Sequence, residues 1–169
     1  MTRRELLGMA SVGVVAVAIG GTVAMRSLAP EAPEGAYPVR RSDSEWRAML
    51  SPAAYRVLRQ NGTEAPFSSP LLNEHRAGLF ACAGCGKPLF DSRTKFDSHT
   101  GWPSFWDVLP KAIAKQDDRS LGMSRTEVRC ANCGGHVGHV FDDGPKPTGL
   151  RYCMNGVAMT FQPASFNGA

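Results

Sequence analysis

The chain has 169 residues, a length typical of one domain. Hydrophobic residues make up 43% of the sequence, so a sizeable core is possible, and the net charge is only +4 with the basic residues scattered along the chain. This distribution argues against a dedicated nucleic-acid binder, which usually carries a basic stripe or patch. Five cysteines, an odd number, leave one thiol outside any set of pairs.

The first 29 residues are interpreted as a targeting segment. Arg3 and Arg4 precede the stretch 8–25, which contains no charged residue, and this order is typical of a signal peptide. The paired arginines resemble the twin-arginine export signal, although Leu6 stands where that signal usually has phenylalanine. The alternative is an uncleaved membrane anchor, because eighteen uncharged residues are near the lower limit for a span. We expect an exported protein, periplasmic or tethered to the membrane and facing the periplasm, with no other membrane contact.

A linker is expected over residues 30–41. It is rich in Pro, Ala and Glu, and such a composition cannot bury enough apolar surface to fold. We therefore expect this segment to act as a flexible tether. The folded part of the chain is expected over residues 42–164 as a single domain, because helix-capping residues and apolar runs begin there.

Two short helices are expected at the start of this domain. Ser42 and Glu45 have the spacing of a capping box, which begins a helix. Pro52 suits the first position of a second helix, and Asn61 followed by glycine suits its end. Residues at helical intervals are expected to face the core: Trp46, Met49, Leu50, Tyr55, Val57 and Leu58. Both helices are therefore expected to be structural.

Beyond Gly78 the pattern changes to short apolar runs separated by Gly, Pro, Asp and Ser. Closely spaced runs of this kind predict antiparallel strands. The runs are 79–81, 88–90, 123–129, 136–141, 150–153 and 157–161. Strands and long helical patterns do not alternate in this part of the sequence. The expected fold is therefore mainly β, of the β-rich α+β class, with the short helices at its N-terminal side.

Two near-identical cysteine pairs predict a metal site. Cys82 and Cys85 form one Cys-x-x-Cys pair, Cys130 and Cys133 form the other, and glycine follows each pair. Four thiolates in two such pairs are typical of a tetrahedral, structural zinc site. The second pair begins 45 positions after the first pair ends, so one Zn²⁺ would clip two distant parts of the domain together and would have no open position for catalysis. The alternative is two disulfides, which an exported location permits.

The fifth cysteine, Cys153, is a candidate reactive thiol. Arg151 precedes it and Asn155 follows it by two positions, so a strand would turn all three side chains to one face. A cation near a thiol favours the thiolate, which is the nucleophilic form. The sequence around Cys153 therefore permits nucleophilic chemistry.

Two histidines precede this segment. His136 and His139 would point to opposite faces of a regular strand unless a bulge intervenes, and Gly138 permits a bulge. A histidine near a thiol can act as an acid or a base. These residues leave catalysis open, because a lone buried cysteine is usually inert and paired histidines often have a structural role.

Several sequence blocks resemble the peptide methionine-R-sulfoxide reductases of the B type. The blocks are 61–67, 95–98, 101–105, 136–141, 143–145 and 151–155, together with both cysteine pairs. The resemblance covers the chain from about Ser42 to Pro163. It implies two antiparallel sheets with helices at the N-terminal side, and one structural Zn²⁺ held by the four paired cysteines.

The same resemblance implies reduction of the R epimer of methionine sulfoxide in peptides and proteins. The Cys153 thiolate would attack the sulfoxide sulfur, and His139 would supply a proton to the oxygen, with Asp143 positioning groups nearby. Methionine would leave, and Cys153 would remain as a sulfenic acid. Trp102 would form the wall of a pocket for the substrate methyl group. The remaining polar lining implied by the resemblance is His136, Arg151 and Asn155.

One position departs from the family pattern. Many members have a cysteine where this chain has Thr100, and that cysteine resolves the sulfenic acid into an internal disulfide. The four paired cysteines are assigned to the metal, so regeneration is expected to need an external small thiol or a thioredoxin-like protein. Oxidised peptides and proteins are the expected substrates, no nucleic-acid partner is expected, and the protein is expected to be a monomer.

Two other functions fit part of the sequence. A non-enzymatic zinc-ribbon module that binds nucleic acid or protein explains four cysteines but not Cys153, and the basic surface with interleaved aromatic residues is lacking. A disulfide-stapled extracellular domain explains the cysteine pairs and would contain no metal. Metal analysis separates this last hypothesis from the other two.

Overall fold

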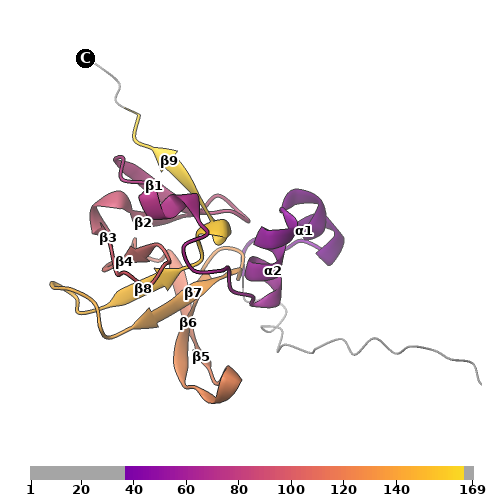
Figure 1. Ribbon diagram of the computed structural model, residues 1–169. Coiled ribbons are helices and arrows are strands. Elements are labelled where there is room, and N and C mark those ends of the chain that lie inside the picture. Colours follow the sequence, from indigo (N-terminus) through magenta and orange to yellow (C-terminus); the bar gives the residue numbers. More distant parts are fainter. Residues whose placement is uncertain (1–36, 166–169) are drawn as a thin grey trace, which may run out of the picture.

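The computed structural model describes residues 37–165, which form two antiparallel sheets beside two short helices (Figure 1). The smaller sheet has the strand order β2-β1-β9 and the larger sheet the order β3-β4-β8-β7-β6-β5. The strands are β1 Gly78–Cys82, β2 Pro88–Asp91, β3 Lys95–Phe96, β4 Ser104–Phe105, β5 Ile113–Asp118, β6 Arg125–Cys130, β7 His136–Phe141, β8 Arg151–Met154 and β9 Met159–Pro163. The predicted mainly β fold with two antiparallel sheets is confirmed.

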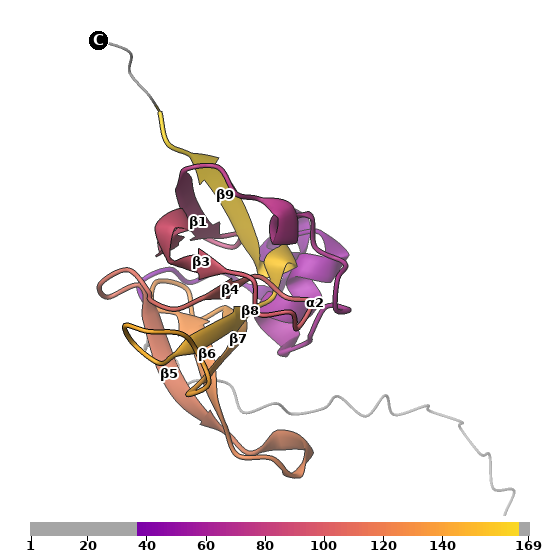
Figure 2. The same ribbon diagram turned by 60° about the vertical axis from the view of Figure 1, so that its left-hand side comes forward.

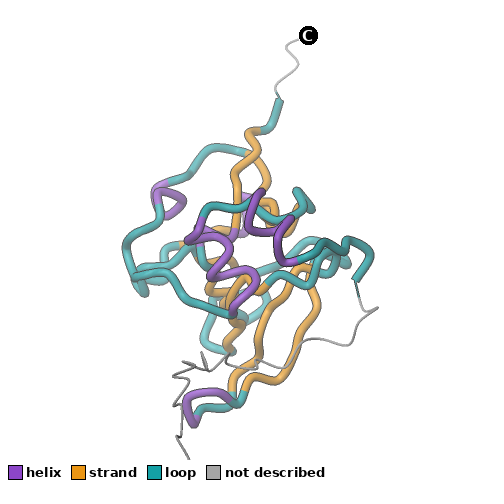
Figure 3. The backbone as a smooth tube through the Cα atoms, turned by 90° about the vertical axis from the view of Figure 1, so that its right-hand side faces the viewer, coloured by secondary structure: helices purple, strands orange, loops and turns teal. Residues whose placement is uncertain are grey.

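The two helices are α1, Asp43–Met49, and α2, Pro52–Gln60. The expected capping box at Ser42 and Glu45 begins α1. Asn61, in the left-handed conformation with φ 55°, ends α2. Helix α2 packs against β7, and Figure 3, seen from the helix side, shows the helices across the middle of the molecule with strands beside and behind them.

The apolar side of these helices agrees with the sequence analysis except at Met49. Five of the six residues expected to face inward are buried: Trp46, Leu50, Tyr55, Val57 and Leu58. Met49 is 50% exposed, so its expected core position is wrong. Because α1 has only seven residues, it buries only Trp46, and Met49 lies to one side of this position. Leu50 is the C-cap residue that follows the helix.

Aromatic side chains from both sheets form the core between them. Phe80 on β1 and Phe90 on β2 contact Phe105 on β4, with ring centroids 4.9 Å and 4.4 Å apart. Phe90 also contacts Tyr152 on β8 at 5.9 Å. Aromatic pairs of this kind contribute about 0.5–1.5 kcal/mol each beyond the area that they bury. The packing fixes β8, which carries Cys153, against the smaller sheet.

Three strands of the larger sheet were not expected from the sequence. Strands β3 and β4 have two residues each, too few to give a pattern. Strand β5 has the sequence Ile-Ala-Lys-Gln-Asp-Asp and lies at the sheet edge, where polar side chains can face water on both sides. Figure 2 shows β5 and β6 extending together away from the rest of the fold.

The contacts of the folded part begin before Ser42. The Val39 amide donates a hydrogen bond of 2.8 Å to the carbonyl of Asn132, and a Cβ on Gly134 would overlap the ring of Tyr37. Tyr37 and Val39, which fall in the expected linker, therefore lie against the second cysteine pair. The predicted signal or anchor, 1–29, lies outside the described residues. Within residues 37–165, no helix has the length and apolar character that a membrane span requires.

Candidate active site and metal centre

Cys153 and His139 are direct partners across strands β8 and β7. Strand β8 is central in this region, because β4 pairs with its other edge and sets Ser104 opposite Cys153. Gly138 allows β7 to approach β8 closely, since a Cβ at this position would overlap the carbonyl oxygen of Cys153. The strand pairing therefore fixes a thiol beside an imidazole.

A bulge in β7 brings both histidines to one side of the sheet. Strand β6 pairs Val128 with Gly138 and the next residue, Arg129, with His136, so Val137 is an extra residue on β7. The rings of His136 and His139 consequently lie edge to face, with centroids 5.4 Å apart. The bulge that the sequence permits is present.

A cavity of about 130 Å³ lies next to Cys153. It brings together four of the predicted site residues: Trp102, His139, Cys153 and Asn155. The rest of the lining is Thr63, Arg125, Gly138, Phe141 and Met154. His136, Arg151 and Asp143 are not part of this lining and lie around it.

A larger hollow of about 600 Å³ lies between α2, the loop 64–71 and the segment 156–159. Its lining contains no cysteine and no histidine. Thiol chemistry therefore points to the smaller cavity, and no residue lines both hollows.

His139 has a carboxylate partner that the sequence analysis did not identify. Its Nε2 lies 2.8 Å from Oδ2 of Asp118 on β5, and Arg125 contacts the same oxygen at 2.7 Å. Burial raises the pKa of Asp118, but hydrogen bonds from Ser120 and His139 and the charge of Arg125 together hold this pKa well below its ordinary value. The carboxylate is therefore charged beside the imidazole.

Opposing effects act on the pKa of His139. Burial lowers it, and the hydrogen bond with Asp118 raises it; the charge of Arg125 adds to the lowering, and the net shift is downward. The imidazole is thus mostly neutral at neutral pH, and Asp118 is the group that supports its charged form.

Asp143 contacts Arg151 and not His139. Arg151 donates from Nε and Nη2 to the two carboxylate oxygens of Asp143, at 2.8 Å and 2.7 Å. These bonds lower the pKa of Asp143, and together with the nearby Cys153 thiol they raise the pKa of Arg151. The guanidinium also lies over the ring of Phe141, 4.4 Å from its centroid. Asp143 is therefore linked to the strand of Cys153 through Arg151.

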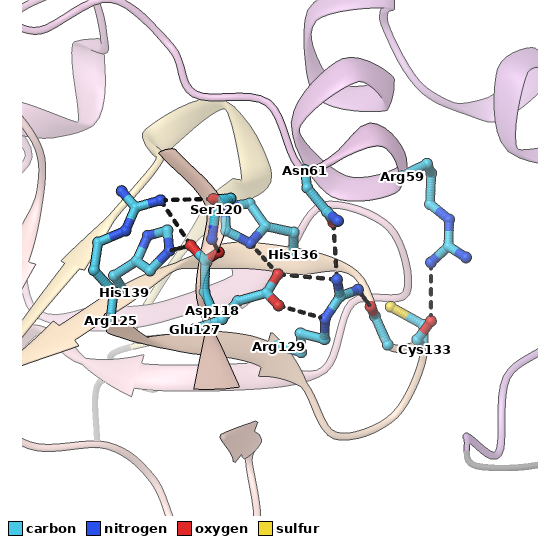
Figure 4. A network of polar contacts seen from close by, with 11 residues as sticks. Arg59, Asn61, Asp118, Ser120, Arg125, Glu127, Arg129, Cys133, His136 and His139 are labelled. Carbon is cyan, nitrogen blue, oxygen red and sulfur yellow. Dashed lines mark hydrogen bonds and ion pairs between the residues drawn. The ribbon is translucent and has the colours of Figure 1, made fainter. Parts of the chain in front are cut away.

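His136 is buried below the cavity, with 2% of its surface exposed. Its Nδ1 lies 2.5 Å from Oε1 of Glu127 on β6, and Arg129 binds the same carboxylate (Figure 4). Burial raises the pKa of Glu127, but His136 and Arg129 more than offset this and lower it. Within the described residues, Nε2 of His136 has no hydrogen-bond partner.

Glu64 holds two of the residues that line the cavity. Its carbonyl accepts a hydrogen bond of 3.2 Å from Nε1 of Trp102, and its amide donates one of 2.9 Å to Oδ1 of Asn155. Its buried carboxylate accepts from the amides of Gly156 and Val157. The amide nitrogen of Asn155 also donates to the carbonyl of Val137. Glu64 thus fixes both the Trp102 indole and the side-chain amide of Asn155.

The four paired cysteines form a site that fits one Zn²⁺. Their sulfur atoms all lie within 4.8 Å of one another. Cys82 and Cys133 are 3.7 Å apart, and Cys85 and Cys130 are 3.6 Å apart. A tetrahedral ion with Zn–S bonds of about 2.3 Å requires sulfur atoms about 3.8 Å apart, whereas a disulfide requires about 2.05 Å. The thiols within the described residues are all free, so the zinc hypothesis is supported over two disulfides.

Sequence reasoning missed the charged groups behind the histidines: Glu64, Asp118, Arg125, Glu127 and Arg129. One signal was present. Arg125, Glu127 and Arg129 alternate along β6, and charges at a period of two on a strand lie on one face. Three charges on the inner part of a sheet indicate a polar network rather than a solvated surface.

Comparisons with known proteins identify the family. Residues 50–163 match the SelR domain. The peptide methionine sulfoxide reductase MsrB of Leifsonia xyli subsp. xyli is 57% identical over 135 residues, which cover 79% of this chain and 97% of that protein. The MsrB of Agrobacterium fabrum is 56% identical over 126 residues, covering 74% and 93%. The MsrB of Leptospira interrogans is 50% identical over 127 residues, covering 75% and 97%. The chain therefore belongs to the SelR-domain family of peptide methionine sulfoxide reductases of the B type.

Proposed function

We propose that this protein reduces the R epimer of methionine sulfoxide in peptides and proteins to methionine. The observation that carries the proposal is the cross-strand pair of Cys153 and His139 at the wall of a small cavity that Trp102 also lines. Sulfoxide reduction by a protein thiol needs a nucleophile, a proton donor and an apolar wall for the substrate. The names of the relatives support the same activity, and the zinc-ribbon binding module is not favoured.

In the first step, the sulfur of Cys153 attacks the sulfoxide sulfur. The bond between the two sulfurs and the sulfur–oxygen bond of the substrate then break, and a new sulfur–oxygen bond leaves the oxygen on Cys153. A thiolate, a sulfoxide and one proton become a sulfenic acid and a thioether, so atoms and charges balance. Asp118 binds Nε2 of His139, and the nitrogen left for the substrate oxygen is Nδ1. This nitrogen carries a proton only when the imidazole is charged or has its other tautomer, which gives Asp118 a role in the step.

The cavity lining supports selection of one sulfoxide epimer. The Trp102 indole would receive the methyl group, since its nitrogen is already bonded to Glu64. The Asn155 amide has one N–H bonded to Val137, which leaves a second N–H for the sulfoxide oxygen. Arg151 and His136 would support the thiolate and the His139 ring from outside the cavity. In the other epimer, methyl and oxygen exchange places, and the oxygen would face the indole.

Regeneration would use an external thiol. The first thiol attacks Cys153 sulfenic acid and forms a mixed disulfide and water; a second thiol then releases Cys153 and leaves an external disulfide. The lining residues around Cys153 include no second cysteine, and the other four thiols lie in the metal cluster. The donor is either a small thiol or a thioredoxin-like protein.

The location that best fits the sequence is outside the cytoplasm. The paired arginines and the uncharged stretch 8–25 support export. The reductase domain would then lie in the periplasm as a monomer, free or tethered through this stretch. Loading of zinc before export would protect the four thiols from oxidation. Fractionation of cells that produce the full chain, with and without substitution of both arginines, tests this location.

The activity is tested with separated R and S epimers of a peptide methionine sulfoxide and a small-thiol reductant. We expect turnover of the R epimer only, and no turnover by Cys153→Ser. Equal reduction of both epimers would contradict the epimer selection, and reduction of neither epimer by zinc-loaded protein would contradict the function.

A further inference from the structure

A buried charged network joins the second cysteine pair to the histidines of the candidate site (Figure 4). Glu127, Arg129 and His136 are 6%, 9% and 2% exposed. Burying charged groups is unfavourable unless each is paired and hydrogen-bonded. In this network every nitrogen of the Arg129 guanidinium has an acceptor. Hydrogen bonds therefore fix the orientation of the guanidinium, in addition to the pairing of its charge.

Arg129 contacts three different parts of the fold. Its Nε donates to Oε2 of Glu127 at 3.0 Å, and its Nη2 lies 3.0 Å from Oε1 of the same residue. Nη2 also donates to Oδ1 of Asn61, at the end of α2, at 2.9 Å. Nη1 donates to the carbonyl of Gly134 at 2.9 Å. Gly134 directly follows the metal ligand Cys133 and has φ +68°, so this carbonyl belongs to the turn that shapes the second cysteine pair.

Glu127 carries the connection onward to the active site. Its Oε1 lies 2.5 Å from Nδ1 of His136, and the ring of His136 lies edge to face with His139. A carboxylate that accepts from Nδ1 keeps a proton on this nitrogen, which fixes both the tautomer and the orientation of the ring. The lone pair of the neutral imidazole is then on Nε2.

We propose that Arg129 is a positioning residue, which fixes His136 of the active site to the second cysteine pair through the Glu127 carboxylate. The metal would hold the turn at Gly134, the turn would hold the guanidinium, and the guanidinium would hold the carboxylate against His136. The zinc site would thus affect the chemical step without taking part in it. The consequence for catalysis rests on the proposed function; the positioning of His136 does not.

A matched pair of arginine variants separates this role from general support of the cysteine pair. Arg59 donates to the carbonyl of Cys133 at 3.1 Å, one residue before the carbonyl that Arg129 binds, and none of its hydrogen bonds reaches Glu127. Arg129→Met and Arg59→Met each remove one guanidinium from the same turn. Only the first also removes the contacts to Glu127.

The experiment measures three quantities in zinc-loaded protein. Elemental analysis gives the metal content, nitrogen NMR of the histidines gives the tautomer of His136, and a single turnover with an R-sulfoxide peptide gives the rate of the chemical step. The chain has four histidines, so His136→Gln assigns the relevant signals. With one zinc bound, Arg129→Met should displace the His136 signals and lower the single-turnover rate about tenfold or more, since a misplacement of about 1 Å can reduce a rate by about 10²-fold. Arg59→Met should leave both at the wild-type values.

Two results would overturn the proposal. Wild-type His136 signals in zinc-loaded Arg129→Met would show that the arginine does not position this ring. Equal displacement in Arg59→Met would assign the effect to loosening of the cysteine pair. If Arg129→Met does not retain zinc, Arg129→Lys replaces it, since lysine keeps the charge but lacks the planar fork; the same signals and the same two results then decide. The NMR spectra are recorded without substrate, so they test positioning even if the protein reduces no sulfoxide.

Discussion

The hydroxyl of Thr100 lies 3.8 Å from the sulfur of Cys153. Ser98 extends this contact, because its hydroxyl is 2.8 Å from that of Thr100 and 2.7 Å from that of the buried Ser104. Ser104 is itself the β4 partner of Cys153. A short chain of hydroxyl groups therefore occupies the side of the thiol where many family members carry their second reactive cysteine.

The hydroxyl chain predicts how the oxidised enzyme behaves. After one equivalent of R-sulfoxide without reductant, Cys153 should remain a sulfenic acid, because none of the residues lining the cavity offers a second thiol. Mass spectrometry should find a dimedone adduct on Cys153 and one zinc per chain. A rapid internal disulfide between Cys153 and a metal-ligating cysteine, with release of zinc, would show that a ligand resolves the sulfenic acid and that the account of regeneration is wrong.

A single substitution should install an internal resolving thiol. In Thr100→Cys, the new sulfur would start about 4 Å from Cys153, as the hydroxyl does, and a shift of about 2 Å would bring it to disulfide distance. We expect one turnover to yield a disulfide between the introduced thiol and Cys153, and no dimedone adduct. Thr100→Ser is the matched control and should still form the adduct. A persistent sulfenic acid in Thr100→Cys would mean that the loop cannot bring the two sulfurs together.

Replacement of the nucleophile should abolish turnover and leave the fold intact. Serine in Cys153→Ser is a far poorer nucleophile than a thiolate, and Cys153 is not among the metal ligands. We expect no detectable reduction of R-sulfoxide, with zinc content and thermal midpoint close to wild type. Any activity retained by this variant would assign the attack to another group.

Loss of one metal ligand should remove metal and stability together. A closed four-thiolate site contributes its binding free energy to folding, and the ligands come from both cysteine pairs. Cys82→Ser and Cys133→Ser should therefore lose zinc in elemental analysis and unfold at a lower temperature. Zinc-free wild-type protein with unchanged stability and two mapped disulfides would instead support a disulfide-stapled domain.

The pH dependence of the chemical step should depend on His139 and Asp118. His139→Ala should slow sulfenic acid formation by about 10²–10⁴-fold, the usual contribution of a general acid. If the charged imidazole supplies the proton, the rate falls as pH rises through the pKa of His139, which burial lowers from its ordinary value. Single-turnover rates measured against pH should therefore show this fall at a pH below the ordinary pKa of a histidine side chain.

Asp118→Asn tests the direction in which the pH profile of the rate shifts. The bond with Asp118 raises the pKa of His139, so its removal should shift the fall in rate to still lower pH and reduce the rate at neutral pH. Arg125 lowers the same pKa, but it also holds Asp118, which makes it the less direct test. A pH profile that does not move in Asp118→Asn would remove the carboxylate from this role.

The sequence predicted the residues that line the cavity better than those that support them. Cys153, His139, Trp102 and Asn155 were identified from the motifs that they share with the family, and the cavity brings them together. Asp118 was missed because it ends a polar edge strand with no apolar period, and its contact with His139 depends on the pairing of β5, β6 and β7. Such pairing is long-range, and a local pattern does not encode it.

The family resemblance also pointed to the less direct carboxylate. The resemblance implied that Asp143, four positions after His139, positions groups near the imidazole. Strand β7 ends at Phe141, however, and the chain then turns so that Asp143 meets Arg151 near the start of β8. A strand carries its residues away from one another at about 3.3 Å per position, so four positions along it already separate the two side chains.

The pairing of β1 with β9 determines the order in which the domain can be completed. Gly78–Cys82 finds its second partner strand only in Met159–Pro163, whereas the last metal ligand is Cys133 and the nucleophile is Cys153. A growing chain therefore contains a full set of ligands first, the reactive thiol second and the closing strand last. Until Met159–Pro163 is synthesised, one edge of β1 is open to pairing with other chains. Capture of zinc at the earlier stage would hold the two cysteine pairs together before β9 is available to pair with the open edge of β1.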